Sequence, residues 1–228
     1  MRLGNKCAVV YFAYRPEKEA VRKPIFPGFG FHQHVEYYRS MQSFVLCQSF
    51  YLGLPFVQID ERSQQGETFA LRFCNAIEKA FSKGFEKLIL LGNDAPEIDE
   101  KAIKNACRTI NGGGSAIVST QRGGACLIAI TKEHYDRQKW LNLPWQSAGL
   151  ADALAQELND SVILQKITEI HSVLDVEKII KDRKAPYDVL LYLVNTLQKS
   201  NDIICEYNVN LYEFSLHTRY LRGPPILF

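Results

Sequence analysis

Short apolar runs alternate with amphipathic stretches over the first half of the chain, and this alternation constrains the fold more than any other feature. Residues 8–12, 55–59 and 87–91 are mostly apolar, as in strands that are covered on both faces of a sheet. Residues 35–52 and 67–83 place apolar side chains at helical spacing. Strands that alternate with helices form βαβ units, so the pattern predicts an α/β fold with a mostly parallel sheet.

The second half of the chain departs from this alternation. Two strand-like segments, 115–120 and 125–130, are joined by only four residues, Gln121-Arg122-Gly123-Gly124. Since four residues cannot form a crossover helix, the pair is predicted to be an antiparallel hairpin. Elsewhere, the segment 14–34 is expected to be a loop, and Asp99 is expected to cap a helix that ends near residue 110. The remaining expected elements are helices at 148–158, 175–181 and 185–199 and a short strand at 162–167.

The length of 228 residues, without a Ser-, Gly- and Pro-rich linker, predicts a single domain over 1–228 with a core from about 7 to 181. The remainder, 182–228, is expected to be helical at first and then an apolar tail that ends in Gly-Pro-Pro-Ile-Leu-Phe. Such a tail docks either on its own domain or on a second copy of the chain. Both a monomer and a homodimer therefore stay open.

Charge and cysteine usage exclude several classes of protein. The formal net charge is +2 with acids and bases mixed along the chain, which argues against a nucleic-acid surface. The six cysteines are scattered without a C-x-x-C pair, so neither a zinc site nor a redox motif is indicated. The apolar run 7–13 is too short to span a bilayer and lacks the features of a signal peptide. We therefore expect a cytoplasmic protein with no membrane span.

The segment Gly92-Asn93-Asp94-Ala95-Pro96 follows the apolar strand at 87–91 and is the best candidate for a functional site. Ligands of parallel sheets bind beyond the carboxyl ends of the strands. A carboxylate there suits a Mg²⁺ or Mn²⁺ ion that bridges a diphosphate, because these cations prefer oxygen ligands. We expect Gly92 to let the backbone turn. The alternative interpretation is a turn in which Asp94 hydrogen-bonds its own backbone.

Several segments together resemble an uncharacterised bacterial family of GT-A-like glycosyltransferases, which is akin to phospholactate guanylyltransferases and molybdenum-cofactor nucleotidyltransferases. The family pattern F-A-K-x-P is similar to Phe12-Ala13-Tyr14-Arg15-Pro16, and G-S-D-C-P is similar to the segment around Asp94. A Gln-Gly stretch that leads to L-G-x-R is similar to 65–72, with Arg72 as the arginine. The resemblance runs from about 7 to 181 and implies a three-layer α/β/α fold of the nucleotide-diphospho-sugar transferase type.

This chain also departs from the family pattern at its acidic positions. The hairpin pattern E-D-G-G has Arg122 in place of the acid before Gly123 and Gly124. The downstream D-V-D is matched with Ser172-Val173-Leu174, which leaves Asp175 as the nearest acid. Of the acidic positions that could hold a metal in the family pattern, only the one at Asp94 is clearly occupied by an acid in this chain. Arg122 either repels a cation or pairs with a diphosphate directly.

Basic residues after the first strand are further candidates. Arg15 and Arg22 lie in the segment where a nucleotide's phosphates are expected, beside Tyr14, which is expected to border the base and ribose. Arg72 matches the family arginine, although arginines on helices commonly extend into solvent. The predicted binding set is therefore Tyr14, Arg15, Arg22, Arg72, Asn93, Asp94, Arg122, Gly123 and Gly124.

Two functions from different classes fit these observations. The first is a glycosyltransferase or nucleotidyltransferase that binds a nucleotide-sugar or a nucleoside triphosphate, with Mg²⁺ or Mn²⁺ at Asp94 stabilising the leaving group. The second is a non-catalytic GT-A-like binding or scaffold module that has lost its metal-binding acids. The sequence identifies no general base. Motifs of dinucleotide oxidoreductases, P-loop enzymes and serine hydrolases do not occur.

Overall fold

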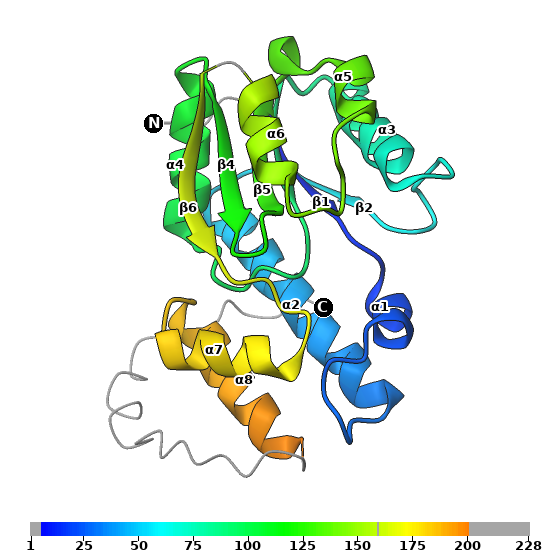
Figure 1. Cartoon of the computed structure of the whole chain (residues 1–228), viewed down its shortest axis with the longest axis vertical. Coiled ribbons are helices and arrows are strands. Elements are labelled where there is room, and N and C mark those ends of the chain that lie inside the picture. The colour runs from blue at the N-terminus through cyan, green and yellow to red at the C-terminus, as the bar shows by residue number, and fades with distance from the viewer. Residues whose placement is uncertain (1–5, 159, 201–228) are drawn as a thin grey trace.

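A computed structural model describes residues 6–158 and 160–200 of the chain (Figure 1). Its six-stranded sheet has the order β2-β1-β3-β5-β4-β6. Only β5 runs antiparallel to its neighbours, β3 and β4, whereas the pairs β1–β2, β1–β3 and β4–β6 are parallel. The strands are β1 (Cys7–Phe12), β2 (Phe56–Ile59), β3 (Lys87–Leu91), β4 (Ser115–Thr120), β5 (Ala125–Thr131) and β6 (Ser161–Ile167). The predicted mostly parallel sheet with an antiparallel hairpin is confirmed.

Helices cover both faces of this sheet and complete the predicted α/β/α arrangement. On one face α3 (Phe69–Ser82), α5 (Arg137–Leu141) and α6 (Leu150–Glu157) pack on apolar side chains of the strands around the fully buried Trp140. On the other face α4 (Glu100–Asn111) and the end of α2 (Phe31–Tyr51) cover a second core that contains Ile103. Alternate residues of the central strands β1 and β3 contribute to the two cores, which explains why these strands are almost continuously apolar.

A third apolar cluster lies below the carboxyl edge of the sheet in the view of Figure 1. It joins α1 (Pro16–Arg22), the first half of α2, α7 (Val173–Asp182) and α8 (Tyr187–Lys199). The expectation that 14–34 is a loop is therefore wrong, because this segment contains α1 and the start of α2. The 3₁₀ turn at Lys132–His134 and the helix α5 were also not expected.

Local signals define several helix ends as expected. The carboxylate of Asp99 accepts a hydrogen bond of 2.7 Å from the backbone N–H of Ala102 and caps α4. The hydroxyl of Thr68 accepts from Leu71 N at 3.2 Å and caps α3 in the same way. The apolar tail, and with it the proposed homodimer contact, falls in 201–228 and so lies outside the described residues. Within the described part of the chain, every helix is too short or too polar to cross a bilayer.

Candidate functional site

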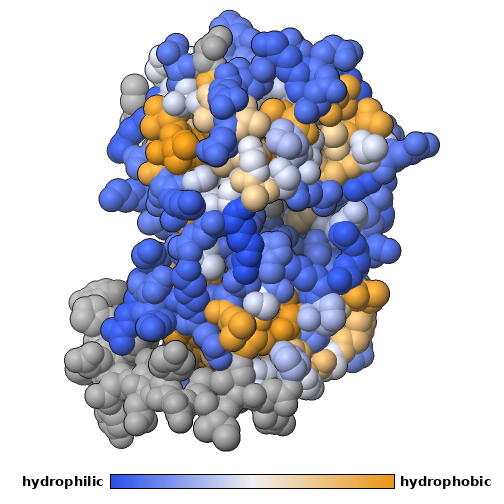
Figure 2. Space-filling model, in the orientation of Figure 1, coloured by the Kyte–Doolittle hydropathy of each residue, from blue (hydrophilic) through white to orange (hydrophobic). Residues whose placement is uncertain are grey.

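A cleft of about 490 Å³ opens at the edge where β1, β3, β4 and β6 have their carboxyl ends. In Figure 2 the surface is hollowed at this level, between the part that carries the sheet and the helical part below it. Backbone that leaves three strands lines it: Ala13-Tyr14 after β1, Gly92-Asn93-Asp94 after β3 and Glu169 after β6. The sheet topology thus brings together segments that are far apart in the sequence.

Asp94 lines the cleft as predicted, and its surroundings are now defined. Its backbone carbonyl accepts a hydrogen bond of 2.9 Å from Ile170 N, which ties the β3–α4 loop to the β6–α7 loop. Its carboxylate Oδ2 lies 3.0 Å from Nζ of Lys23, at the end of α1. Gly92 has an ordinary negative-φ backbone, and a Cβ there would meet nothing within 4 Å. The loop therefore does not depend on glycine at this position.

Glu19 is a buried carboxylate that also lines the cleft. Burial raises its pKa, and the negative charge of Asp94 raises it further, whereas Arg22, Lys23 and a hydrogen bond with Asn93 act in the opposite direction. The groups from α1 and from the β3–α4 loop therefore form one coupled set of charges. Asn93, predicted from the motif, has a structural partner in this set.

Tyr14 and Arg22 form a stacked pair at the mouth of the cleft. The guanidinium carbon of Arg22 lies 4.1 Å from the centroid of the Tyr14 ring, which is the geometry of a cation–π contact. Both residues line the cleft, and their roles in binding stay predictions. A guanidinium in a cation–π contact still has N–H groups that can donate to phosphate oxygens.

Aromatic side chains form the opposite wall. Phe69 and Phe73 stack with ring centroids 5.6 Å apart, and Trp145 contacts both rings at 5.6 and 4.9 Å. Arg72 and Gln64 border this wall. Two buried atoms there, Nε of Arg72 and Oε1 of Gln64, have no hydrogen-bond partner. Buried polar atoms without partners are rare, and both residues line a cleft large enough for a ligand.

Arg122 reaches across to the start of α7. Its Nη2 donates to Oδ1 of Asp175 at 2.6 Å, and its Nη1 donates to the carbonyl oxygen of Glu169 at 3.2 Å. Asp175 also accepts from the backbone N–H groups of His171 and Ser172 and from the Ser172 hydroxyl. Burial opposes ionisation of Asp175, but these hydrogen bonds outweigh it and lower its pKa. Arg122 lines the cleft, whereas Asp175 has its oxygens engaged.

The two glycines of the hairpin have different surroundings. A Cβ on Gly123 would lie 1.8 Å from the carbonyl oxygen of Ala148, and its φ is +81°. Gly123 therefore approaches the α5–α6 loop and is not among the residues that line the cleft. Gly124 does line it, with a Cβ position 3.3 Å from a carboxylate oxygen of Glu169.

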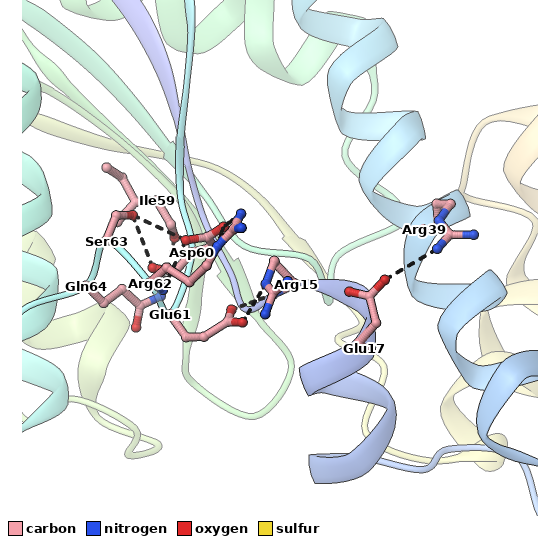
Figure 3. A network of polar contacts seen from close by, with 9 residues as sticks. All are labelled: Arg15, Glu17, Arg39, Ile59, Asp60, Glu61, Arg62, Ser63 and Gln64. Carbon is pink, nitrogen blue, oxygen red and sulfur yellow. Dashed lines mark hydrogen bonds and ion pairs between the residues drawn. The ribbon is translucent and has the colours of Figure 1, made fainter.

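Arg15 lies outside the cleft lining, in contrast to its predicted role. Its Nε donates to Oε1 of Glu61 at 2.7 Å, and its backbone N–H donates to the other carboxylate oxygen at 2.9 Å (Figure 3). Close by, Asp60 pairs with Arg62, and Glu17 pairs with Arg39. Arg15 thus ties the end of β1 to the loop after β2.

Sequence reasoning missed five residues that line the cleft: Glu19, Gln64, Trp145, Glu169 and His171. Oε2 of Glu169 lies 3.5 Å from Nε2 of His171. Both follow β6 directly, so the rule that ligands bind beyond strand carboxyl ends was the signal that applied to them. Glu19, Gln64 and Trp145 lie on a helix or in loops, and only the tertiary packing of these segments brings them to the cleft.

The donor set does not fit a resident divalent ion that the protein alone would hold. In residues 6–158 and 160–200, His, Cys, Asp and Glu side chains form no group of three or more that could bind a metal. Asp94 has an ammonium group at its carboxylate, and Asp175 is saturated by donors. A Mg²⁺ or Mn²⁺ ion at Asp94 stays a prediction.

Comparisons with known proteins agree with the fold. Residues 55–147 match the model of a family described as an uncharacterized protein conserved in bacteria (DUF2064). A crystal structure from Desulfovibrio desulfuricans, provisionally assigned as a nucleotide-diphospho-sugar transferase, is similar with a TM-score of 0.65 and 18% identity. The similarity covers 86% of this chain and 98% of the chain in that crystal structure. At that identity the likeness shows the fold alone, and this fold agrees with the predicted three-layer α/β/α arrangement.

Two further solved structures are more distant. A glycosyltransferase involved in the glycosylation of the major capsid of PBCV-1 gives a TM-score of 0.42 at 14% identity, over 70% of this chain and 81% of its own. A CMP:2-keto-3-deoxy-manno-octonic acid synthetase in complex with CTP gives a TM-score of 0.39 at 12% identity, over 76% of this chain and 96% of the synthetase chain. A search of the curated proteins gives no match.

Proposed function

We propose that the chain binds a nucleotide-sugar or a nucleoside triphosphate in this cleft and transfers its glycosyl or nucleotidyl group. The observation that carries the proposal is the pair of partnerless buried atoms, Arg72 Nε and Gln64 Oε1, beside an aromatic wall in a cleft at the strand ends. A donor and an acceptor next to apolar rings match the edge and the faces of a nucleobase.

The two ends of the cleft suit the two parts of such a ligand. Trp145, Phe69 and Phe73 offer apolar surface for the base. Arg22 and Arg122 offer guanidinium groups for the phosphates, which they bind with strong, charge-assisted hydrogen bonds. As the bond to the leaving diphosphate breaks, negative charge grows on its oxygens, and these guanidinium groups stabilise it.

The pair Glu169 and His171 supplies the group that the sequence did not identify, a proton acceptor. In a glycosyl transfer the acceptor oxygen attacks the sugar's anomeric carbon, the bond to the diphosphate breaks, and the acceptor loses its proton. We assign that proton to His171, with the Glu169 carboxylate at 3.5 Å stabilising the charged imidazole. Both side chains line the cleft, so an acceptor can reach them.

The second function, a non-catalytic binding module, is favoured by a different observation. Both acids near the expected metal position, Asp94 and Asp175, are paired with basic side chains of the chain itself. A retained fold with neutralised acids would bind a nucleotide without turnover. Hydrolysis of a nucleotide-sugar by the wild-type protein that is abolished in His171→Ala would exclude this alternative.

Calorimetry with UDP-, GDP-, CDP- and ADP-sugars and the four nucleoside triphosphates, each with and without Mn²⁺, tests the proposal. We expect one base to bind, and Arg72→Met to weaken it by about ten- to a hundredfold, the effect of one hydrogen bond to a charged group. Arg108→Met is the matched control, because Arg108 lies on α4 outside the cleft lining. If no member of the panel binds, or if both variants weaken binding equally, the proposal is wrong.

A further inference from the structure

Two basic side chains of this chain stand at the acids where a divalent cation would be expected. Lys23 Nζ lies 3.0 Å from Asp94 Oδ2, and Arg122 Nη2 lies 2.6 Å from Asp175 Oδ1. We propose that these internal cations replace the divalent ion, so that the cleft binds the phosphates of its nucleotide without a metal. The inference rests on the proposed function, because it concerns the same ligand.

Lys23 is held in place more firmly than an ordinary surface lysine. Its backbone N–H donates to the carbonyl oxygen of Glu19 at 2.8 Å and closes the last turn of α1. The hydroxyl of Tyr38 on α2 donates to the carbonyl oxygen of Lys23 at 2.6 Å. Tyr38 itself is buried in the cluster of α1, α2, α7 and α8. These contacts fix the backbone of Lys23, and its ammonium group lies at the Asp94 carboxylate.

An ammonium group at this position opposes a second cation. A divalent ion on the Asp94 carboxylate would lie within a few ångströms of Nζ, where like charges repel strongly in a partly buried site. The Lys23 side chain is 22% exposed and that of Asp94 is 35% exposed, so water screens the repulsion only in part. With three N–H donors, the same ammonium keeps Asp94 as one partner and has donors left for a phosphate oxygen.

Arg122 pairs with Asp175 in the same way as Lys23 pairs with Asp94. Asp175 receives four hydrogen bonds, three at Oδ2 and one at Oδ1, so both of its oxygens already have donors. The Arg122 side chain remains 52% exposed and lines the cleft, although Asp175 and the Glu169 carbonyl fix its orientation. A guanidinium that is held at one edge and open at the other is suited to a diphosphate.

The test compares nucleotide binding in excess EDTA and in excess Mn²⁺, with the fluorescence of Trp145 in the cleft as the signal. We expect the wild-type dissociation constants to agree within about twofold, and Lys23→Met to weaken binding in EDTA by about ten- to a hundredfold. Lys18→Met removes a lysine of α1, the helix that Lys23 caps, but not the ion pair with Asp94, so this variant should behave like the wild type. Titration of the wild type with Mn²⁺ alone, followed by the EPR signal of the free ion, should show no stoichiometric binding.

The outcomes separate this inference from the proposed function. Nucleotide binding that requires Mn²⁺, or stoichiometric Mn²⁺ binding by the wild type alone, would overturn the inference and leave the proposed function intact. Unchanged binding by Lys23→Met in EDTA would overturn the role of Lys23. If no nucleotide binds under either condition, both proposals fall. The wild-type measurements decide the question even if Lys23→Met does not fold.

Discussion

Replacing Gly123 by alanine tests how the hairpin between β4 and β5 is fixed against the α5–α6 loop. The added Cβ would lie 1.8 Å from the carbonyl oxygen of Ala148 and 2.6 Å from its carbonyl carbon. Real Cβ contacts begin near 3.0 Å, so the backbone must separate by about 1.2 Å. The obstacle is backbone and not the flexible end of a side chain, so the change cannot be absorbed by a rotamer.

Three costs add in this variant. A φ of +81° is unfavourable for alanine by about 1–2 kcal/mol. Separation of the two segments breaks the hydrogen bond of 3.0 Å from Ala151 N to the Gly123 carbonyl, which costs a further 1–2 kcal/mol or so. Lost packing raises the total to about 3–4 kcal/mol, which corresponds to a fall in Tm of about 10 °C for a chain of this length.

Thermal unfolding followed by circular dichroism measures the effect, with two glycine variants as controls. Gly84→Ala has a similar φ of +91° but no atom within 4 Å of its Cβ, so it isolates the backbone cost of about 1–2 kcal/mol. Gly92→Ala has neither problem and should leave Tm nearly unchanged. If Gly123→Ala is no less stable than Gly84→Ala, the close approach to Ala148 is not the reason for glycine there.

Two further predictions concern side chains that fix local structure. Asp99→Ala removes the carboxylate that caps α4 and should lower the free energy of unfolding by about 1 kcal/mol in urea titrations, with Asp99→Asn close to wild type. Asp175→Asn should lower it by about 1–2 kcal/mol at pH 7. Because the pKa of Asp175 is lowered in the folded state, its contribution to the free energy of unfolding is complete above the unfolded pKa of about 4 and is lost as the pH falls through the folded pKa. The difference in unfolding free energy between Asp175→Asn and the wild type should therefore shrink in acid. A difference that grew in acid would contradict this reasoning.

The sequence predicted the elements whose cause is local. The continuous apolar runs became buried strands, the four-residue connection became an antiparallel hairpin, and Asp99 became a helix cap. The helix α1 was missed because it has only seven residues and buries only Glu19 and Ala20, so apolar periodicity could not reveal it. Pro16 at its first position was the available signal.

The site was predictable only in part. Residue type and position in the sequence identify candidates, but tertiary contacts determine which of them line the cleft. Asp94, Tyr14, Arg22, Arg72 and Arg122 all line the cleft. Arg15 was a candidate of the same kind, but it pairs with Glu61, 46 positions away, and lies outside the cleft lining. No spacing rule distinguishes Arg15 from Arg22, because the choice depends on how the loop after β2 meets the end of β1.

The departures from the family pattern gain a different meaning from their positions in space. In the sequence, Arg122 and the missing acids before Asp175 read as separate losses of metal ligands. In the structure Arg122 and Asp175 form one ion pair across 53 positions, and Lys23 completes the same arrangement at Asp94. Random loss of ligands would leave buried or half-buried carboxylates unpaired, which is costly. Here Asp94 and Asp175 each have a basic side chain within ion-pair distance, and this pairing is what a site adapted to work without a divalent ion requires.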